Sequence, residues 1–391
     1  MPASPIAALR NRLAQLETDN RVRVRHILDS PQGREIRIGD ATFLSFCSND
    51  YLGLAADARV ADALRHGIAQ YGVGSGASHL VCGHMRAHHA LEEELADFTG
   101  CARALLFSTG YMANLGIGSV LPGRGGTVFE DKLNHASLID AARASGATVR
   151  RYRHGDMPRL QALLEQSAGE KLIFSDGVFS MDGDVAPLAV LAPLTLQYGA
   201  WLVVDDAHAL GVLGAAGKGS FEQAGVAQTD TTLLMGTLGK AFGTFGAFVA
   251  GDNAVIEALM QFARTYIYTT ALPPAIAEAT RASLRIVRTE PWRREVLRER
   301  VASFRAGARR LGVRLTDSDT PIQPILLGDD LRAVQVADKL RARGLLVSAI
   351  RPPTVPEGGA RLRVTFSALH TEADVTRLLE ALAAVLAETA T

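Results

Sequence analysis

The sequence predicts an α/β protein in which helices sandwich a mostly parallel sheet, followed by a smaller α+β C-terminal domain. Short apolar strands alternate with helical segments from about residue 57, as in parallel sheets with crossover helices. The alternation breaks at the LPP string of residues 272–274. We expect an N-terminal helix and strand segment over 1–50, a large ligand-binding domain over 51–285 and a small domain over 286–391.

Hydrophobic periodicity predicts the helices and strands of the first two thirds of the chain. Residues 5–28 form an Arg-bearing amphipathic pattern that predicts a helix, and a turn with short strands is expected over 31–50. Helical periodicity covers 57–70 and 84–98, and a helix is expected from Tyr111. Strands of the large domain are expected at 103–108, 127–130, 171–176, 201–206, 231–237 and 246–250.

The C-terminal third has a different pattern. A long helical stretch, interrupted at Pro291, runs to about residue 311. The expected strands are PIQPILL, GLLVSAI and ARLRVTFS, and the expected helices cover 331–343 and 372–388. Three strands and two helices of this size indicate a small α+β domain.

Composition excludes several classes of protein. The 391 residues are 48% hydrophobic, and 41 basic residues balance 41 acidic ones, so the chain lacks the positive field of a nucleic-acid binder. Its apolar runs stay below the roughly 18 residues of a membrane-spanning helix, and the N-terminus lacks the order of a signal peptide. The three cysteines, Cys47, Cys82 and Cys101, show no paired spacing. We therefore expect a cytoplasmic protein that acts on small molecules, away from membranes and nucleic acids.

Two strand ends carry polar residues that suggest a ligand site. Ligands of open parallel sheets bind beyond the carboxyl ends of the strands. The strand ending at Ser108 leads through Gly110 into a helix, whose free N–H groups could bind a phosphate, although a tight turn explains the same residues. WLVVDDAH places Asp205 at the end of a buried strand with His208 just beyond it, although a capping role would also suit Asp205.

A third strand ends near one of the few lysines. GTLGKAFG sets Lys240 in a Gly-flanked loop, which does not match the P-loop spacing and could be a solvated loop. Together, an anion site, a buried Asp and a loop Lys match pyridoxal phosphate, which would place its phosphate at Gly110 and Tyr111, its ring nitrogen at Asp205 and its aldehyde on Lys240. Residues available to stack on the ring or reach its hydroxyl are His135, Ser180 and His208.

Two other motifs compete with this interpretation. His84 and His88 have the spacing of a helical metal pair, but HMRAH lacks the Glu of HExxH and no third ligand is fixed, so we expect no metal site. The string GVGSG at 72–76 is not the dinucleotide fingerprint and follows a helix.

The motifs as a set resemble those of the α-oxoamine synthases over almost the whole chain. This resemblance implies an aspartate-aminotransferase-like fold of type I, a pyridoxal phosphate cofactor and a homodimer with shared active sites. The strings IRPPTVP (350–356) and the N-terminal Arg segment are most similar to members that condense L-alanine with a pimeloyl thioester, on coenzyme A or acyl carrier protein, in biotin biosynthesis. The matching strings are SNDYLGL, GVGSGAS, FSTGYMAN, DKLNHASL, GVFSMDGD, VDDAH, GTLGKAFG, YTTALPP and RPPTVPEGGARLRVT.

The resemblance also implies residue roles. Lys240 would hold the cofactor and act as base, Asp205 would keep the ring nitrogen protonated, and His135 would stack on the ring. Thr237 would contact the phosphate, as would Thr270 from the other subunit. The expected substrate-binding residues are Arg351 for the amino-acid carboxylate, with Arg23, Asn49 and Thr354.

Some positions depart from the family pattern and leave alternatives open. Ala209 and Leu210 stand where HGTG is usual, Asp176 replaces a Glu, and His79 stands where Arg is common. A sister enzyme that uses glycine or serine is the nearest alternative, since one methyl group is worth roughly 1 to 3 kcal/mol in a pocket. A non-catalytic partner subunit is another, and the retained Lys240 speaks against it. A membrane-surface role of the N-terminal helix has little support, because acidic residues interrupt its arginines.

Overall fold

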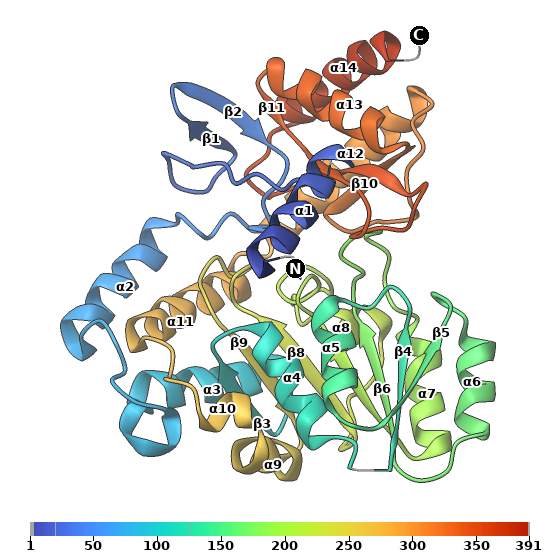
Figure 1. The fold of residues 1–391 in the computed structure, drawn as a ribbon. Helices are drawn as coiled ribbons and strands as arrows, with labels where there is room; N and C mark the ends of the chain where they lie inside the picture. The colour runs from blue at the N-terminus through green and yellow to red at the C-terminus, as the bar shows by residue number, and fades with distance from the viewer. Residues whose placement is uncertain (1–3, 20, 124, 390–391) are drawn as a thin grey trace.

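The computed structural model describes residues 4–19, 21–123 and 125–389, and its centre is a mixed sheet in the large domain (Figure 1). Within the described residues this sheet has seven strands, in the order β3-β9-β8-β7-β6-β4-β5. β9 runs antiparallel to both neighbours, and the other pairs are parallel, which confirms the expected mostly parallel sheet. The strands are β3 (Arg103–Phe107), β4 (Thr127–Asp131), β5 (Thr148–Tyr152), β6 (Lys171–Asp176), β7 (Ala200–Asp205), β8 (Thr232–Thr237) and β9 (Ala247–Gly251).

Side chains alternate between the two faces of the sheet, and each face is covered by helices. Val203 belongs to one apolar cluster, while its neighbours Leu202 and Val204 belong to the other. The Val203 face packs against α4 (Gly110–Val120), α5 (Ala136–Ala144), α9 (Asn253–Phe262) and α10 (Arg264–Ile267). The opposite face packs against α3 (Arg86–Thr99), α6 (Met157–Glu165), α7 (Leu188–Tyr198) and α11 (Pro274–Thr289). The remaining elements of this part are α2 (Ala58–Tyr71), the π-helical turn η1 (His79–Gly83) and α8 (Ser220–Ala224).

The small domain combines both ends of the chain (Figure 1). One of its sheets pairs β10 (Ile322–Gly328), β13 (Ala360–Thr365) and β12 (Ser348–Ile350) in antiparallel fashion. The other joins the hairpin β1 (Glu35–Ile38) and β2 (Ala41–Ser45) to β11 (Leu345–Leu346), which runs parallel to β2. Its helices are α12 (Trp292–Arg310), α13 (Asp330–Ala342) and α14 (Glu372–Glu388).

The expected N-terminal helix is shorter than predicted. Helix α1 covers Pro5–Thr18 and buries none of its side chains, and residues 21–28 have no regular structure. The prediction of a helix to residue 28 is wrong there because RVRVR alternates Arg with β-branched Val, a period of two that favours extended backbone. None of the described helices has the length and apolarity needed to cross a bilayer.

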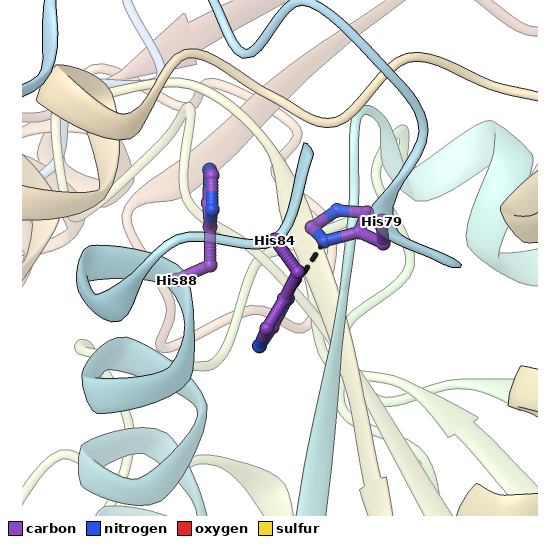
Figure 2. Close-up of side chains that lie close together, drawn as sticks. All are labelled: His79, His84 and His88. Carbon is purple, nitrogen blue, oxygen red and sulfur yellow. Dashed lines mark hydrogen bonds between the residues drawn. The ribbon is translucent and has the colours of Figure 1, made fainter. Parts of the chain in front are cut away.

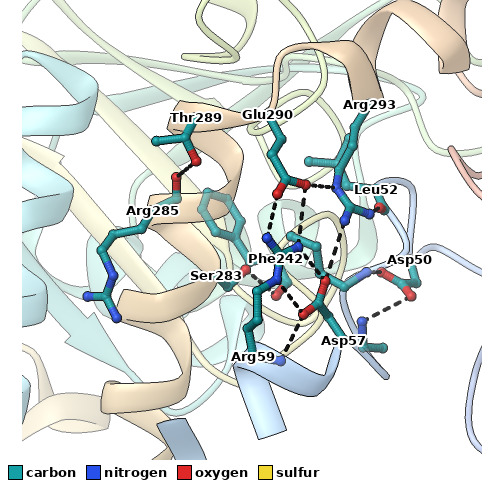
Figure 3. Close-up of polar contacts among 12 residues, drawn as sticks. Asp50, Leu52, Asp57, Arg59, Phe242, Ser283, Arg285, Thr289, Glu290 and Arg293 are labelled. Atoms are coloured by element: carbon teal, nitrogen blue, oxygen red, sulfur yellow. Dashed lines mark hydrogen bonds and ion pairs between the residues drawn. The ribbon is translucent and has the colours of Figure 1, made fainter. Parts of the chain in front are cut away.

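A network of charged residues fixes the loop between β2 and α2 (Figure 3). The buried Arg293 guanidinium donates to the Leu52 carbonyl (2.7 Å) and pairs with Glu290 (2.8 Å) and Asp57 (3.4 Å). Within the loop, the Asp50 carboxylate accepts from the Leu54 amide (2.8 Å). The segment that contains Asn49 and Tyr51 is thereby held against the end of α11, where it faces the site described next.

Candidate active site

Asp205 ends β7 and lies at the carboxyl edge of the sheet, where only 4% of it is exposed. Its Oδ2 accepts from Asn114 Nδ2 (2.8 Å) and its Oδ1 from the Ala207 amide (3.1 Å). Among the described residues no Lys, Arg or His forms an ion pair with it. A buried carboxylate held by two neutral donors is suited to bind a protonated ring nitrogen.

Lys240 follows β8, the strand beside β7, and its amine lies next to a histidine. The distance from Lys240 Nζ to His208 Nε2 is 3.0 Å. Burial lowers the pKa of Lys240 to about 8, against the opposing charges of Asp205 and Asp176. The amine is therefore closer to neutral than an ordinary lysine, as a base or a nucleophile toward an aldehyde requires.

His208 connects this amine to the N-terminal segment. Its Nδ1 lies 2.6 Å from Tyr51 Oη, and Tyr51 in turn donates to Asn49 Oδ1 (3.2 Å). Burial lowers the pKa of His208 well below its usual range, so the ring is neutral. The consistent arrangement of protons has His208 Nδ1–H donating to Tyr51, which leaves Nε2 as the acceptor for the Lys240 amine.

His135 follows β4 and caps α5. Its amide donates to Asp176 Oδ2 (2.7 Å), and its Nδ1 lies 2.7 Å from Ser137 Oγ. Burial lowers the pKa of His135 and raises that of Asp176 well above its usual range, where the charge of Asp205 adds to the effect. Asp176, which replaces the Glu expected from the family pattern, therefore fixes the backbone from which His135 projects.

The expected phosphate site lies at the start of α4. The helix begins at Gly110, and Thr109 caps it by accepting from the Met112 amide (3.2 Å). The first turn of a helix leaves N–H groups without internal partners, here at Gly110 and Tyr111. A Cβ on Gly110 would lie 3.3 Å from Met235, so little room is left for a side chain there.

Two further expected phosphate residues lie in different surroundings. Thr237 ends β8 and donates to the Gly246 carbonyl (3.2 Å). Thr270 lies on an exposed segment that pairs with Ser78.

The expected substrate residues fall into two places. Asn49 belongs to the series of hydrogen bonds that runs from Lys240 through His208 and Tyr51. The other three, Arg23, Arg351 and Thr354, line a neighbouring cavity of about 680 Å³, which is also lined by Arg21 and Arg341. A second cavity, of about 540 Å³, is lined by His135, Ser180 and Lys132, and Thr354 borders both cavities.

Three residues of the site were not predicted. The buried Arg363 donates through Nε to the Ser180 carbonyl (2.7 Å) and through Nη1 to Asn49 Oδ1 (3.3 Å). Tyr51 and Asn114 are the others. The available signal was the alternation in ARLRV, which puts Arg361 and Arg363 on one face of β13, where Arg361 pairs with Asp182 (2.6 Å).

The residues present therefore fit pyridoxal phosphate. The buried Asp205 forms no ion pair among the described residues, the Lys240 amine has a lowered pKa, and a helix start free to bind an anion follows β3 of the same sheet. These are the three groups that the ring nitrogen, aldehyde and phosphate need.

Comparisons with known proteins agree with this geometry. Residues 41–382 match the family model for class I and II aminotransferases. The 8-amino-7-oxononanoate synthase of Methylococcus capsulatus is 59% identical over 95% of this chain and 96% of its own length. That of Cellvibrio japonicus is 55% identical over 100% of this chain and 98% of its own length.

Solved structures share the fold. A lysine-to-alanine variant of the serine palmitoyltransferase of S. paucimobilis, with a bound PLP-myriocin aldimine, has a TM-score of 0.94 at 30% identity, covering 99% of this chain and 100% of that one. The 8-amino-7-oxononanoate synthase of Francisella tularensis has a TM-score of 0.79 at 33% identity, covering 89% of this chain and 99% of that one.

Proposed function

The chain belongs to the class I and II aminotransferase family and, within it, to the 8-amino-7-oxononanoate synthases, and we propose its function from this premise. It condenses L-alanine with a pimeloyl thioester, and the products are 8-amino-7-oxononanoate, carbon dioxide and the free thiol of the carrier. The observation that carries the proposal is the position of the Lys240 amine. It lies 3.0 Å from the neutral His208, and it follows β8, the strand that pairs with the one ending at the buried Asp205.

The cofactor is pyridoxal phosphate, which when bound serves as an electron sink for the carbanion at the alanine Cα. Asp205 would hold a proton on its ring nitrogen. Gly110, Tyr111 and Thr237 would bind its phosphate, while Ser180 and His208 would bond the ring oxygen and His135 would stack on the ring. In a homodimer, Thr270 would serve the site of the second copy, in keeping with its exposed position here.

Lys240 performs the proton transfer in this proposal. Its Nζ takes the proton from the alanine Cα and later returns one to the product, which its lowered pKa permits near neutral pH. The bond to His208 Nε2 fixes the direction of the amine, and Tyr51 in turn fixes the His208 ring. These contacts position the base without a charge change in the imidazole.

We place the alanine carboxylate at Arg363 rather than at Arg351. Arg363 is buried and bonded to Asn49, which belongs to the same hydrogen-bonded chain as Lys240. Arg351 shares the larger cavity with Arg23 and Thr354, whose cationic lining suits the anionic groups of the pimeloyl thioester. The two arginines would thus bind different substrates.

The cellular location is the cytoplasm in this proposal. Cys47, Cys82 and Cys101 are all free thiols, as a reducing compartment would maintain them.

The decisive experiment measures thiol release from pimeloyl-coenzyme A by cofactor-saturated protein with L-alanine, glycine or L-serine. Alanine-dependent release, with 8-amino-7-oxononanoate as product, is expected. Release with only glycine or only serine would instead assign the chain the activity of a sister enzyme that uses that amino acid. If no amino acid supports release from pimeloyl-coenzyme A or from the pimeloyl carrier protein, the proposed function is wrong.

A further inference from the structure

A cluster of histidines at the start of α3 lies outside the machinery assigned above. The rings of His79, His84 and His88 lie close together, with centroids 5.2 to 5.7 Å apart (Figure 2). Three imidazoles so close together suggest a metal site, but each must have a free lone pair to act as a ligand.

His88 does not have one. Its Nδ1 accepts from the Met85 amide (2.9 Å), and its Nε2 donates to the Leu272 carbonyl (2.7 Å). Both nitrogens are therefore committed to the backbone, and His88 is a structural residue that ties α3 to the segment before α11. The expectation of no metal site rested on the missing Glu of HExxH and on the lack of a fixed third ligand beside His84 and His88, and it stays a prediction.

His84 is different, because one of its nitrogens is directed at a carboxylate. Its Nδ1 lies 2.9 Å from His79 Nδ1, and its Nε2 lies 3.8 Å from Glu92 Oε2. His79 is itself held by stacking on Tyr266, with ring centroids 5.1 Å apart. When His84 donates through Nδ1 to His79, its Nε2 keeps a lone pair toward Glu92. The hydrogen bond to His79 is then the outer contact that usually orients a metal-binding imidazole.

Glu92 and His89 supply two more ligand atoms. Glu92 lies one turn along α3 from His88, its side chain is 13% exposed, and its Oε1 accepts from the Leu106 amide (2.9 Å), which leaves Oε2 available. His89 is half exposed, and its Nε2 lies 3.4 Å from Oε1 of the exposed Glu93, one turn further along α3. Ligand atoms of His84, His89 and Glu92 all lie within 4.8 Å of one another. Binding at Zn–N and Zn–O distances of about 2.0–2.2 Å needs only small side-chain rotations from this arrangement.

Charge and space also favour a cation here. Among the described residues Glu92 forms no ion pair with Lys or Arg, although the charge of Arg103 acts on its carboxylate. The group borders a cavity of about 340 Å³, whose lining also includes Arg103, and that guanidinium is already paired with Glu257 (2.7 Å). An ion could therefore enter and keep water on its open positions.

We propose that His84, His89 and Glu92 bind a divalent transition-metal ion such as Zn²⁺, with His79 orienting His84 from outside the ligand shell. Two imidazoles and one carboxylate suit Zn²⁺ and its neighbours in the first transition row, whereas Mg²⁺ and Ca²⁺ prefer oxygen ligands. The ion would join the η1 turn to the first two turns of α3, and it would do so independently of the condensation reaction.

The test uses tag-free, cofactor-saturated protein freed of metal with a chelator, titrated with Zn²⁺ by calorimetry. We expect about one ion per chain, and at least tenfold weaker binding in His89→Ala and Glu92→Gln. His89 is half exposed, so His89→Ala should fold and keep its thiol release, which serves as the check of integrity. Co²⁺ should give a ligand-field absorption spectrum with wild-type protein that His84→Ala lacks.

Two control variants separate this site from adventitious binding. His66→Ala removes an exposed histidine of α2, and Cys82→Ser removes an exposed thiol near His84, and both should bind Zn²⁺ as wild type does. Equal binding by wild type, His89→Ala and Glu92→Gln would overturn the proposal, as would loss of the ion in Cys82→Ser or the absence of binding by wild type.

Discussion

The Nζ atom of Lys240 lies 3.0 Å from Nε2 of His208. The two residues follow neighbouring parallel strands, β8 and β7, so the sheet itself fixes their separation. Because burial keeps the imidazole neutral, His208 can accept a bond from the amine without competing for its proton. In the proposed reaction the pair would therefore act as an aligned base with a fixed direction of approach.

Replacement of Lys240 by Ala should abolish thiol release and the absorbance band of the bound cofactor. The amine supplies both the covalent attachment and the base, and among the described residues no second lysine is hydrogen-bonded to His208. Absorption spectra and the thiol assay measure the two effects. Lys218→Ala, in another Gly-flanked loop, is the matched control, and activity retained by Lys240→Ala would contradict the assignment.

Asp205→Asn should retain the cofactor but lower kcat by roughly 10² to 10⁴, the usual contribution of a proton held at a reacting system. The amide keeps the shape of the carboxylate but can accept from only one of Asn114 and Ala207, and it cannot hold a proton on the ring nitrogen. Steady-state kinetics at saturating cofactor measure the loss. A fully active Asp205→Asn protein would rule out this role.

Tyr51→Phe should lower kcat by up to about tenfold, because one neutral hydrogen bond is worth about 0.5 to 1.5 kcal/mol. The substitution leaves the His208 Nδ1–H without its acceptor 2.6 Å away and frees the ring to turn. The KM for alanine should change less than kcat, since Tyr51 acts through His208. Tyr198→Phe, on the exposed end of α7, is the control, and equal kcat in both variants would refute the positioning role.

Arg363→Gln and Arg351→Gln should affect different substrates. Loss of the buried Arg363 should raise the KM for alanine at least tenfold, in line with about 1.5 to 3 kcal/mol for a hydrogen bond to a charged group. Arg351→Gln should instead raise the KM for the pimeloyl thioester. The opposite pattern would return the alanine carboxylate to Arg351.

His154 predicts a pH dependence of stability. It bonds Asp131 (3.1 Å) and Asp184 (2.8 Å), which together raise its pKa to about 10. Because the folded pKa is above the unfolded value, this stabilisation is complete below about pH 6.5 and is lost as the pH rises toward 10. His154→Gln should therefore lower the unfolding free energy by about 1 to 2 kcal/mol at pH 6 and by much less at pH 10. Denaturant unfolding at both pH values measures this, and an equal loss at both would exclude the ion pairs as the cause.

The sequence predicted those site residues that directly follow strands of one sheet. Asp205 and Lys240 come after adjacent parallel strands, whose carboxyl ends meet at one edge, so their proximity follows from the strand pattern. Arg363 could not be found in this way, because it reaches the site from β13 of the small domain and meets Asn49, more than three hundred residues earlier. Contacts of that kind depend on domain packing, which local periodicity does not encode.

The same distinction explains the remaining differences. β5 was not predicted because TVRRY is a polar, partly exposed edge strand without an apolar run. The contact between Glu92 and His84 was not predicted, because the helix expected over 84–98 begins at Arg86 and leaves His84 outside its periodicity.

The pairing of β2 with β11 has a consequence for synthesis of the chain. Leu44 pairs with Leu345, and the Thr365 amide donates to the Phe46 carbonyl (2.8 Å). The β1–β2 hairpin therefore leaves the ribosome long before its partners at Leu345 and Thr365 have been translated. Until then its apolar face is a candidate for chaperone binding, and truncation before residue 345 should leave β2 without β11 and the Asn49 and Tyr51 loop held only from its Arg293 side.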